Sequence, residues 1–236
     1  MTDLSVTKRV LGGLWGAVVG DALGVPVEFQ SREQLRQNPV QDMRGYGTYH
    51  QPAGTWSDDS SLTLCTVEGL ADGFDTGCLG MLFTRWLNQA HWTPWQEVFD
   101  VGWTTLMAIN RLSQGVEPEQ AGLIDENSNG NGSLMRILPV ALRYFDLPVE
   151  ELLDHAHRAS ALTHPFVARW PVASTARWCQ PFYRVPTRLK HTSKLSGQRS
   201  RFTKDHRIPE NCLRSQGFSV AIYPHCLSPA SGRVAM

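Results

Sequence analysis

The sequence predicts an all-α domain over residues 1–165, followed over residues 166–236 by a basic tail that is poorly structured. Apolar residues recur at helical spacing through the first part. The alternation of apolar and polar residues that marks a half-buried strand never lasts beyond four or five residues there. With 236 residues, 42% of them hydrophobic, the chain can hold one folded domain and a tail. A collagen, a coiled coil and a disordered acidic chain are excluded.

Helices are expected in five places, the first near the N-terminus. Val10, Leu14 and Val18 lie four residues apart and form an apolar stripe. A second helix is predicted from about Ser60 to Ala71, where Gly73 suits a left-handed C-terminal cap. The third has an apolar face with the spacing i, i+3, i+4, i+7, i+8, formed by Leu79, Leu82, Phe83, Trp86 and Leu87.

The last two helices lie further along the chain. One is predicted from about Asp100 to Leu112 and ends at Gly115. The other begins at Pro148, and one of its faces comprises Leu152, Leu153, Ala156 and Ala161. The connections 38–56 and 125–133 are long and rich in Gly, Asn and Asp. Because long structured loops on a rigid scaffold commonly carry binding residues, we expect the functional site there.

The net charge is zero, but the charges are distributed unevenly. Residues 1–165 carry 10 Lys or Arg against 20 Asp or Glu, whereas residues 166–236 carry 12 against 2. The tail also holds six prolines and eight serines, and only Phe218–Tyr223 resembles a strand. This composition lacks the apolar density for a core of its own, so a domain boundary is predicted after Pro165.

The cysteines and the apolar stretches predict a cytoplasmic protein without a membrane partner. The five cysteines include no C-x-x-C pair and are odd in number, which argues against a zinc site or a disulfide framework. The longest apolar stretch, residues 11–20, stops at Asp21 and is shorter than the roughly 20 residues of a membrane span. No small-x-small cleavage site precedes Asp21, so secretion is not expected.

Two motifs place carboxylates where ionisation is unfavourable, one among apolar residues and one beside a second carboxylate. The first is G-D-A-L-G at 20–24, followed by Glu28 among apolar residues, where lost solvation raises a carboxyl pKa and suits it to proton transfer. The alternative interpretation of this motif is a helix cap at Gly24 and an ordinary loop acid at Glu28.

The second motif is G-T-W-S-D-D-S at 54–60, whose adjacent acids Asp58 and Asp59 repel each other unless a divalent cation such as Mg²⁺ binds them. The alternative is a helix N-terminus capped by Ser57 or Asp58.

Two further motifs lie later in the acidic part. In F-D-V-G, Asp100 is expected to open a helix. In S-N-G-N-G-S-L-M-R at 128–136, two Asn-Gly steps run into a predicted helix. Glycines allow a ligand to approach the backbone closely, and free N–H groups at a helix start suit a phosphate. This is not a P-loop because no Gly-Lys-Ser/Thr follows, and a plain turn is the alternative.

Taken in order, these motifs resemble the ADP-ribosylglycohydrolase family. The similarity rests on G-D-A-L-G with Glu28, G-x-W-S-D-D-S, F-D-V-G-W-T-T, G-N-G-S-L-M-R and T-H-P at 163–165, and it covers about residues 8–165. The resemblance implies an orthogonal all-α fold with a Mg²⁺ or Mn²⁺ centre. It also implies cleavage of the N- or O-glycosidic bond that joins ADP-ribose to a side chain or a small group.

The resemblance assigns roles to eleven residues. The implied metal ligands are Ser57, Asp58 and Asp59, and the acidic groups near the scissile ribose are Glu28 and Asp100. The residues implied to bind the ligand are Asn129, Gly130, Asn131, Gly132, Ser133 and His164. Carboxylates beside the anomeric carbon stabilise positive charge on the ribose and activate water or protonate the leaving group. The implied partner is an ADP-ribosylated protein or a small ADP-ribose conjugate.

The sequence stops resembling the family after T-H-P. The second metal motif of the family, D-x-D-T or D-x-D-S, is missing, and Asp205 and Glu210 are the only acids of the tail. A reading-frame shift or truncation, a genuine basic appendage, and an atypical C-terminal half each account for this. We therefore expect weakly bound Mg²⁺ (or Mn²⁺) and low or absent hydrolysis. The alternative is an inactive ADP-ribose-binding or scaffold protein or a gene remnant, and nucleic acid is not expected as a partner.

Overall fold

The computed structural model describes residues 5–128 and 130–165. Within them the chain is helical and contains no strand, which confirms the all-α prediction there. The α-helices are α1 (Val6–Gly24), α2 (Arg32–Gln37), α3 (Asp58–Gly69), α4 (Thr76–Gln89), α5 (Trp103–Ser113), α6 (Leu138–Arg143) and α7 (Val149–Ala161). Three short 3-10 helices are η1 (Val25–Val27), η2 (Pro118–Gln120) and η3 (Glu126–Ser128). The predicted tail, its boundary after Pro165 and the strand-like segment 218–223 lie outside the described residues.

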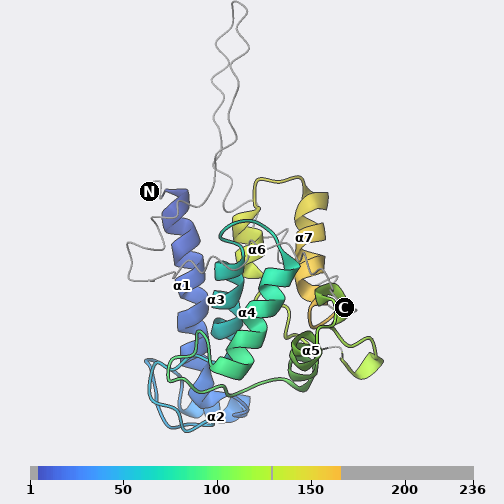
Figure 1. Ribbon diagram of the computed structural model, residues 1–236. Helices are drawn as coiled ribbons and strands as arrows, with labels where there is room; N and C mark the ends of the chain where they lie inside the picture. Colours follow the sequence, from blue (N-terminus) through green and yellow to red (C-terminus); the bar gives the residue numbers. More distant parts are fainter. Residues whose placement is uncertain (1–4, 129, 166–236) are drawn as a thin grey trace, which may run out of the picture.

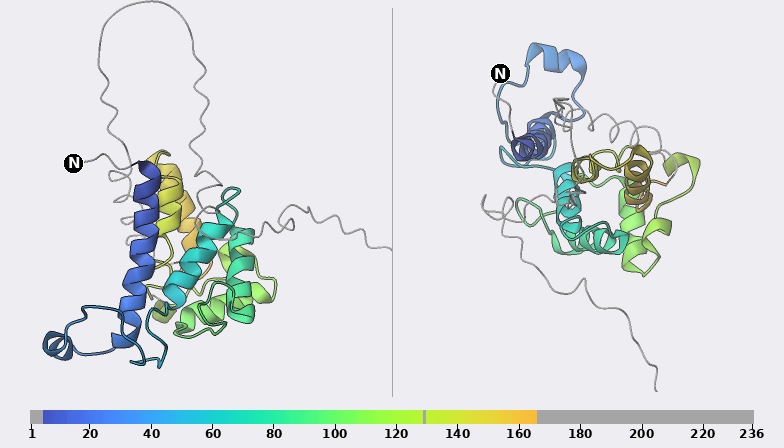
Figure 2. Two further views of the ribbon diagram at one scale, coloured as in Figure 1. Left: turned by 90° about the vertical axis from the view of Figure 1, so that its left-hand side faces the viewer. Right: turned by 90° about the horizontal axis from the view of Figure 1, so that it is seen from above.

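Helix α3 occupies the middle of the bundle. It packs against α1 on one side, α4 on another and α6 on a third, while α4 also packs against α5. In Figure 1, α1, α4 and α7 run up the picture whereas α5 is seen nearly along its axis, so the helices cross at steep angles. Figure 2 shows α2 standing away from the other helices, beyond one end of α1.

The core forms around α4, whose apolar stripe was predicted. Leu79, Leu82, Phe83 and Trp86 are all buried, and Asp75 caps the helix by accepting a hydrogen bond from Gly77 N–H. Burial of each such side chain contributes about 1.5–3 kcal/mol. The partners of this stripe come from α3, α5, α6 and α7, and include Leu62, Ile109, Val140, Leu152 and Ala156.

Helix α1 is longer than its apolar stripe indicated. It begins after the cap Ser5, buries Val10, Val18 and Ala22, and continues through Asp21. With η1 it forms the one helix among the described residues that is long and apolar enough to cross a membrane, with a mean hydropathy of 1.6 over a window that is 28% buried. A core helix or an N-terminal signal sequence satisfies the same criterion.

Three sequence expectations need correction. The G-D-A-L-G motif forms the end of α1, and the cap residue is Val25, whereas the alternative interpretation placed the cap at Gly24. Asp100 does not open a helix: it lies in the left-handed region with φ of 59°, and α5 begins at Trp103 after the cap Gly102. The Asn-Gly steps run into a series of turns, and α6 starts only at Leu138.

Candidate functional site

A cleft of about 850 Å³ opens beside the end of α1 and the start of α3. The start of α5, the turns at 130–132 and His164 also line it. Nine of the eleven predicted site residues line it: Glu28, Ser57, Asp58, Asp59, Asp100, Gly130, Asn131, Gly132 and His164. The structure thus gathers motifs from five separate places in the sequence around one hollow.

Asp21 fastens α1 to the first turn of α3. Its Oδ1 accepts from the Ser57 hydroxyl at 2.8 Å, and its Oδ2 accepts from Ser57 N–H at 3.0 Å. Oδ2 also accepts from the N–H and the hydroxyl of Ser60, at 3.1 and 2.5 Å. One carboxylate therefore satisfies four donors at a helix N-terminus, where negative charge is favoured.

Asp58 and Asp59 stand next to this anchor and face different surroundings. Asp58 is only 6% exposed, and its burial, followed by the charges of Asp59, Asp100 and Asp21, raises its pKa to about 8. The Asp59 side chain is exposed, yet lost hydration and then the charges of Asp21, Asp100 and Glu28 raise its pKa to about 6. The acids of the cleft thus repel one another, and protons or a cation are needed to offset that repulsion.

Ser57 caps α3, as the alternative interpretation of the motif predicted. Its hydroxyl donates to Asp21 and accepts from Asp59 N–H at 3.2 Å. A hydroxyl has one proton and two lone pairs, so one lone pair is left for a cation or a ligand. The capping interpretation and the metal interpretation of this residue are therefore compatible.

Tyr49 joins the two acids that were predicted to be catalytic. Its hydroxyl lies 2.8 Å from Oε2 of Glu28 and 2.5 Å from Oδ1 of Asp100. Lost solvation and then these two acids raise the pKa of Tyr49, so the phenol keeps its proton. Because a phenol has a single proton, the second contact is a hydrogen bond only when one of the carboxyls is itself protonated.

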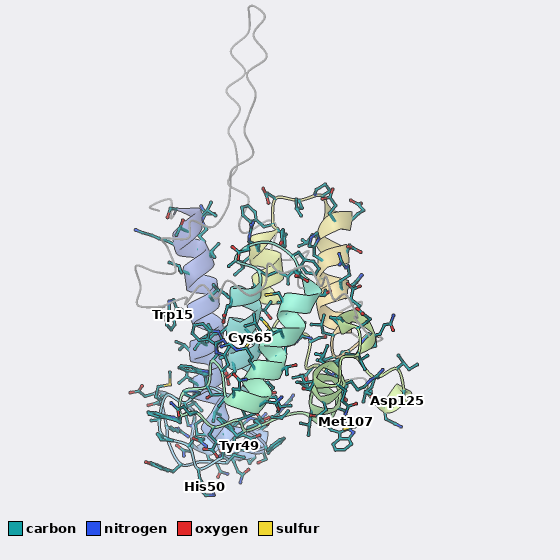
Figure 3. All side chains as sticks on the ribbon, in the orientation of Figure 1. Trp15, Tyr49, His50, Cys65, Met107 and Asp125 are labelled. Atoms are coloured by element: carbon teal, nitrogen blue, oxygen red, sulfur yellow. The ribbon has the colours of Figure 1, made fainter. Side chains whose placement is uncertain are left out.

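Asp100 is suited to hold that extra proton. Burial raises its pKa to about 6 against the opposing effect of the Tyr49 hydrogen bond, and Glu28 raises it further. Its backbone conformation at φ of 59° is uncommon outside glycine, and such conformations gather at functional sites. Figure 3 shows Tyr49 among the loops beneath the upright helices.

The loop that carries Tyr49 rests directly on the segment that carries Glu28. Thr48 donates its N–H to the carbonyl of Pro26 at 3.2 Å and its hydroxyl to the carbonyl of Glu28 at 2.7 Å. A Cβ at Gly47 would lie 1.8 Å from that Pro26 oxygen, so only glycine permits this approach. The Tyr49 ring also packs on Phe99, with centroids 5.3 Å apart.

His164 closes the cleft on the side of the Asn-Gly turns. It is 3% exposed, and its burial, followed by the charge of Arg136, lowers its pKa to about 4. A Cβ at Gly132 would lie 2.8 Å from Cε1 of His164 and 2.8 Å from Oγ1 of Thr105. Glycine at this position therefore lets the turn pack tightly against the imidazole.

Two predicted ligand-binding residues are not among these nine. The side chain of Ser133 is buried and does not line the cleft: its Oγ lies 2.9 Å from Oγ of Ser160, which also lies 3.0 Å from the carbonyl of His164. Ser133 thus supports the His164 backbone from behind. Asn129 lies outside the described residues.

The donor set of the cleft is suited to a hard cation but is incomplete. Ser57, Asp58 and Asp59 supply oxygens, the ligand type that Mg²⁺ prefers, and burial together with neighbouring acids raises the pKa of both carboxyls, a repulsion that a cation would offset. Across residues 5–128 and 130–165, no three His, Cys, Asp or Glu side chains are arranged to hold a metal ion. These residues therefore fit part of a metal site.

Comparison with protein families identifies the family of the chain. The sequence model described as ADP-ribosylglycohydrolase matches residues 2–171. The chain belongs to the ADP-ribosylglycohydrolase family. The match spans all the motifs on which the sequence resemblance rests and confirms it.

Individual members of the ADP-ribosylglycohydrolase family show the same relationship. An ADP-ribosylarginine hydrolase of Pseudomonas putida is 32% identical over 145 residues, which are 60% of this chain and 38% of that protein. The ADP-ribosyl-dinitrogen reductase glycohydrolase of Rhodospirillum rubrum is 32% identical over 154 residues, which are 64% of this chain and 49% of the relative. The chain therefore spans half or less of the length of these relatives.

A solved structure agrees with the sequence comparison. An ADP-ribosylglycohydrolase-related protein complex is similar with a TM-score of 0.61 and 34% sequence identity. The similarity covers 73% of this chain and 55% of that one. The described helices thus have the fold of this family.

The structure adds three functional candidates that the sequence did not single out. Asp21 lies in a quoted motif but was given no role, although an acid at the end of an apolar helix is an available signal. Arg136 also lies in a quoted motif without an assigned role, whereas Tyr49 lies in none. Their partners are 27 and 51 residues away in the chain, so residue spacing does not reveal these contacts. Such contacts arise only from the tertiary fold.

Proposed function

We propose that the cleft binds ADP-ribose and that the chain hydrolyses the glycosidic bond between ADP-ribose and a modified protein side chain or small group. The membership in the ADP-ribosylglycohydrolase family supports the reaction class. The observation that carries the assignment is the convergence of Glu28, Asp100 and His164 on one cleft of about 850 Å³. Such a volume suits a nucleotide-sized ligand.

The acids of the cleft suit cleavage at an anomeric carbon. Positive charge develops on the ribose as the bond to the leaving group breaks, and the carboxylates of Glu28 and Asp100 stabilise it. With a pKa of about 6, Asp100 exchanges its proton near neutral pH, as a general acid or base must. Tyr49 holds the two carboxyls together, so the protonated and the ionised member of the pair can interchange.

We propose Mg²⁺ (or Mn²⁺) as the cofactor, held weakly. Ser57, Asp58 and Asp59 would hold the ion, and its chemistry there would be to orient ribose hydroxyls and water. The incomplete donor set supports weak binding, since each carboxylate contributes charge that offsets the cost of dehydrating the ion. The cysteine pattern supports a cytoplasmic location, which we propose on that ground alone.

The acceptor of the ADP-ribosyl group is proposed to be a protein side chain. The Pseudomonas putida relative is named for ADP-ribosylarginine, which makes an ADP-ribosylated arginine peptide the first substrate to test. The rival function is an ADP-ribose-binding or scaffold protein without turnover, and the partial metal site favours that rival.

Release of ADP-ribose from such a peptide tests the proposal. We expect slow release that needs added Mg²⁺ and falls about tenfold or more in Asp100→Asn and in Glu28→Gln, since removal of an acid–base group costs at least that much. Glu150→Gln, an exposed acid at the start of α7, is the matched control and keeps the wild-type rate. Binding of ADP-ribose without release would support the rival function, and neither binding nor release would indicate a gene remnant.

A further inference from the structure

A buried chain of hydrogen bonds runs from Arg136 to the imidazole of His164. Arg136 donates from Nη2 to Oγ1 of Thr163 at 2.8 Å, and that oxygen lies 2.8 Å from Nδ1 of His164. Arg136 and Thr163 are each 0% exposed. Solvent therefore does not take part in this chain, so the protons shared by Thr163 and His164 must find their acceptors within it.

The donors and acceptors of this chain determine which atoms carry its protons. A guanidinium only donates, so Thr163 accepts from Arg136 and has its own single proton left to donate. In the part of the chain that the structure describes, Nδ1 of His164 is the one acceptor within reach of that hydroxyl. If Nδ1 carried a proton, the buried Thr163 proton would have no acceptor, which costs about 1–3 kcal/mol. The ring proton of His164 therefore belongs on Nε2.

The ring holds only this one proton at neutral pH. Burial, and then the positive charge of Arg136, lower the pKa of His164 to about 4. The Arg136 guanidinium is held by a second bond to the carbonyl of Ala159 at 3.0 Å and by the face of Phe83, 4.5 Å from its centroid. Burial lowers the pKa of Arg136 to about 9, so the guanidinium stays charged at neutral pH, and these contacts hold its charge behind the histidine.

The protonated nitrogen points toward the ligand side of the cleft. A Cβ at Gly130 or at Gly132 would lie 3.4 Å from Nε2 of His164, so this atom faces the turns that line the hollow. The backbone of His164 is fixed as well, because its N–H donates to the Ser160 carbonyl at 2.9 Å and its carbonyl lies 3.0 Å from Oγ of Ser160. The direction of the Nε2–H bond is thus set before a ligand arrives.

We propose that Arg136 and Thr163 are positioning residues that lock His164 as the neutral Nε2–H tautomer, so that it donates a hydrogen bond to an oxygen of ADP-ribose. The ligand half of this statement rests on the proposed function. The tautomer half does not, because it follows from the hydrogen bonds of the chain alone. A histidine locked in this way is a donor only and cannot serve as a general base at Nε2.

A second histidine, His155, serves as an internal control because it is expected to adopt the other tautomer. Nδ1 of His155 lies 2.6 Å from the carbonyl oxygen of Glu151. A carbonyl accepts and never donates, so His155 must carry its proton on Nδ1. The two histidines are therefore expected as opposite tautomers in one sample.

Two-bond ¹H–¹⁵N correlation of the full chain labelled at histidine, recorded at pH 7 without ligand, tests the tautomer. Signals are assigned with His164→Gln and His155→Gln. We expect the pattern of an Nε2–H ring for His164 and of an Nδ1–H ring for His155. An Nδ1–H ring or a charged ring at His164 would overturn the proposal, whether or not the chain binds ADP-ribose.

The role of Thr163 is tested by changing its hydroxyl without changing its shape. In Thr163→Val we expect His164 to lose its single tautomer and ADP-ribose affinity to fall about tenfold, the effect of one lost hydrogen bond. Thr163→Ser restores both, and His155→Gln leaves the affinity unchanged. An unaltered affinity in Thr163→Val, with the altered tautomer observed, would overturn the ligand half. If Thr163→Val does not fold, the wild-type spectrum and Thr163→Ser still decide the tautomer.

Discussion

Asp21 and Ser57 are joined by two hydrogen bonds, from the hydroxyl and from the backbone N–H of the serine, at 2.8 and 3.0 Å. This pair connects the last turn of the long N-terminal helix to the first turn of the central helix. It therefore holds Asp58 and Asp59 at the wall of the cleft. The same carboxylate also accepts from Ser60, so the acidic end of α3 depends on a single side chain of α1.

Replacing Asp21 by Asn is expected to destabilise the fold. An amide has one acceptor oxygen and brings an NH₂ group toward the Ser57 and Ser60 donors, so about two hydrogen bonds to a charged group are lost. We expect a loss of about 2–4 kcal/mol in the free energy of unfolding, measured by urea denaturation. Asp72→Asn, an exposed acid beyond the end of α3, is the control. Equal stability of the two variants would show that the Asp21 anchor is dispensable.

Tyr49→Phe is expected to separate the two acids while keeping the ring that packs on Phe99. The Tyr49 hydrogen bond lowers the pKa of Asp100, so its removal raises that pKa above about 6. The acidic limb of the pH–rate profile then moves to higher pH, and kcat falls about tenfold with little change in KM.

Tyr46→Phe, in the same loop and 72% exposed, is the matched control for this change. It should reproduce the wild-type profile. A Tyr49→Phe enzyme with an unshifted acidic limb would show that the phenol does not hold the carboxyl pair.

The stability of the chain without metal is expected to fall as the pH rises from about 4 to about 8. The Asp58 carboxyl ionises near 3.8 in the unfolded chain but near 8 in the folded one. The folded state therefore binds more protons across that interval, and raising the pH favours unfolding. Asp58→Asn removes the unfavourable ionisation of this carboxyl. The melting temperature of the variant should therefore exceed that of the wild type by a few degrees at pH 8 and by a much smaller amount at pH 5. A melting temperature of the wild type that rises with pH, and that Asp58→Asn does not alter, would contradict the burial of an uncompensated acid.

Mg²⁺ is expected to stabilise the chain only weakly. Three oxygen donors leave about half of a six-oxygen coordination shell to water or ligand. Millimolar Mg²⁺ should therefore raise the melting temperature only slightly. Asp58→Asn should change this increase in melting temperature little. Thermal denaturation with increasing Mg²⁺, and metal analysis after dialysis, measure this. A stoichiometric metal that survives dialysis and is lost in Asp58→Asn would show that residues beyond the described ones complete the site.

The sequence predicted the elements whose information is local. The apolar stripe of α4 and the capping role of Ser57 follow from residue spacing, and the structure shows both. Helix α2 buries no residue and so has no stripe, although its Ser31–Gln34 capping box was readable in the sequence. Helix α6 is short and has a proline in its first turn. Its apolar residues form a run too short to distinguish a helix from any other buried segment.

The sequence predicted which residues form the site, but not how their side chains are arranged in space. The order of the motifs brought Glu28 and Asp100 together as candidates, but only the fold shows that Tyr49 touches both. The φ of 59° at Asp100 has no sequence signal, because aspartate is tolerated in that conformation without requiring it. The sequence predicted a helix after the Asn-Gly steps, but turns follow them, and the side chain of Ser133 is buried without lining the cleft.

Calorimetric titration of ADP-ribose into the full chain tests the central claim most directly, namely that the acidic cleft beside His164 is an ADP-ribose site. We expect saturable binding of one ADP-ribose per chain. Binding should be lost in Gly132→Ala, whose Cβ would lie 2.8 Å from the imidazole, and kept in Gly12→Ala, whose Cβ meets nothing within 4 Å. No binding by the folded wild-type chain, or equal binding by Gly132→Ala, would contradict the claim.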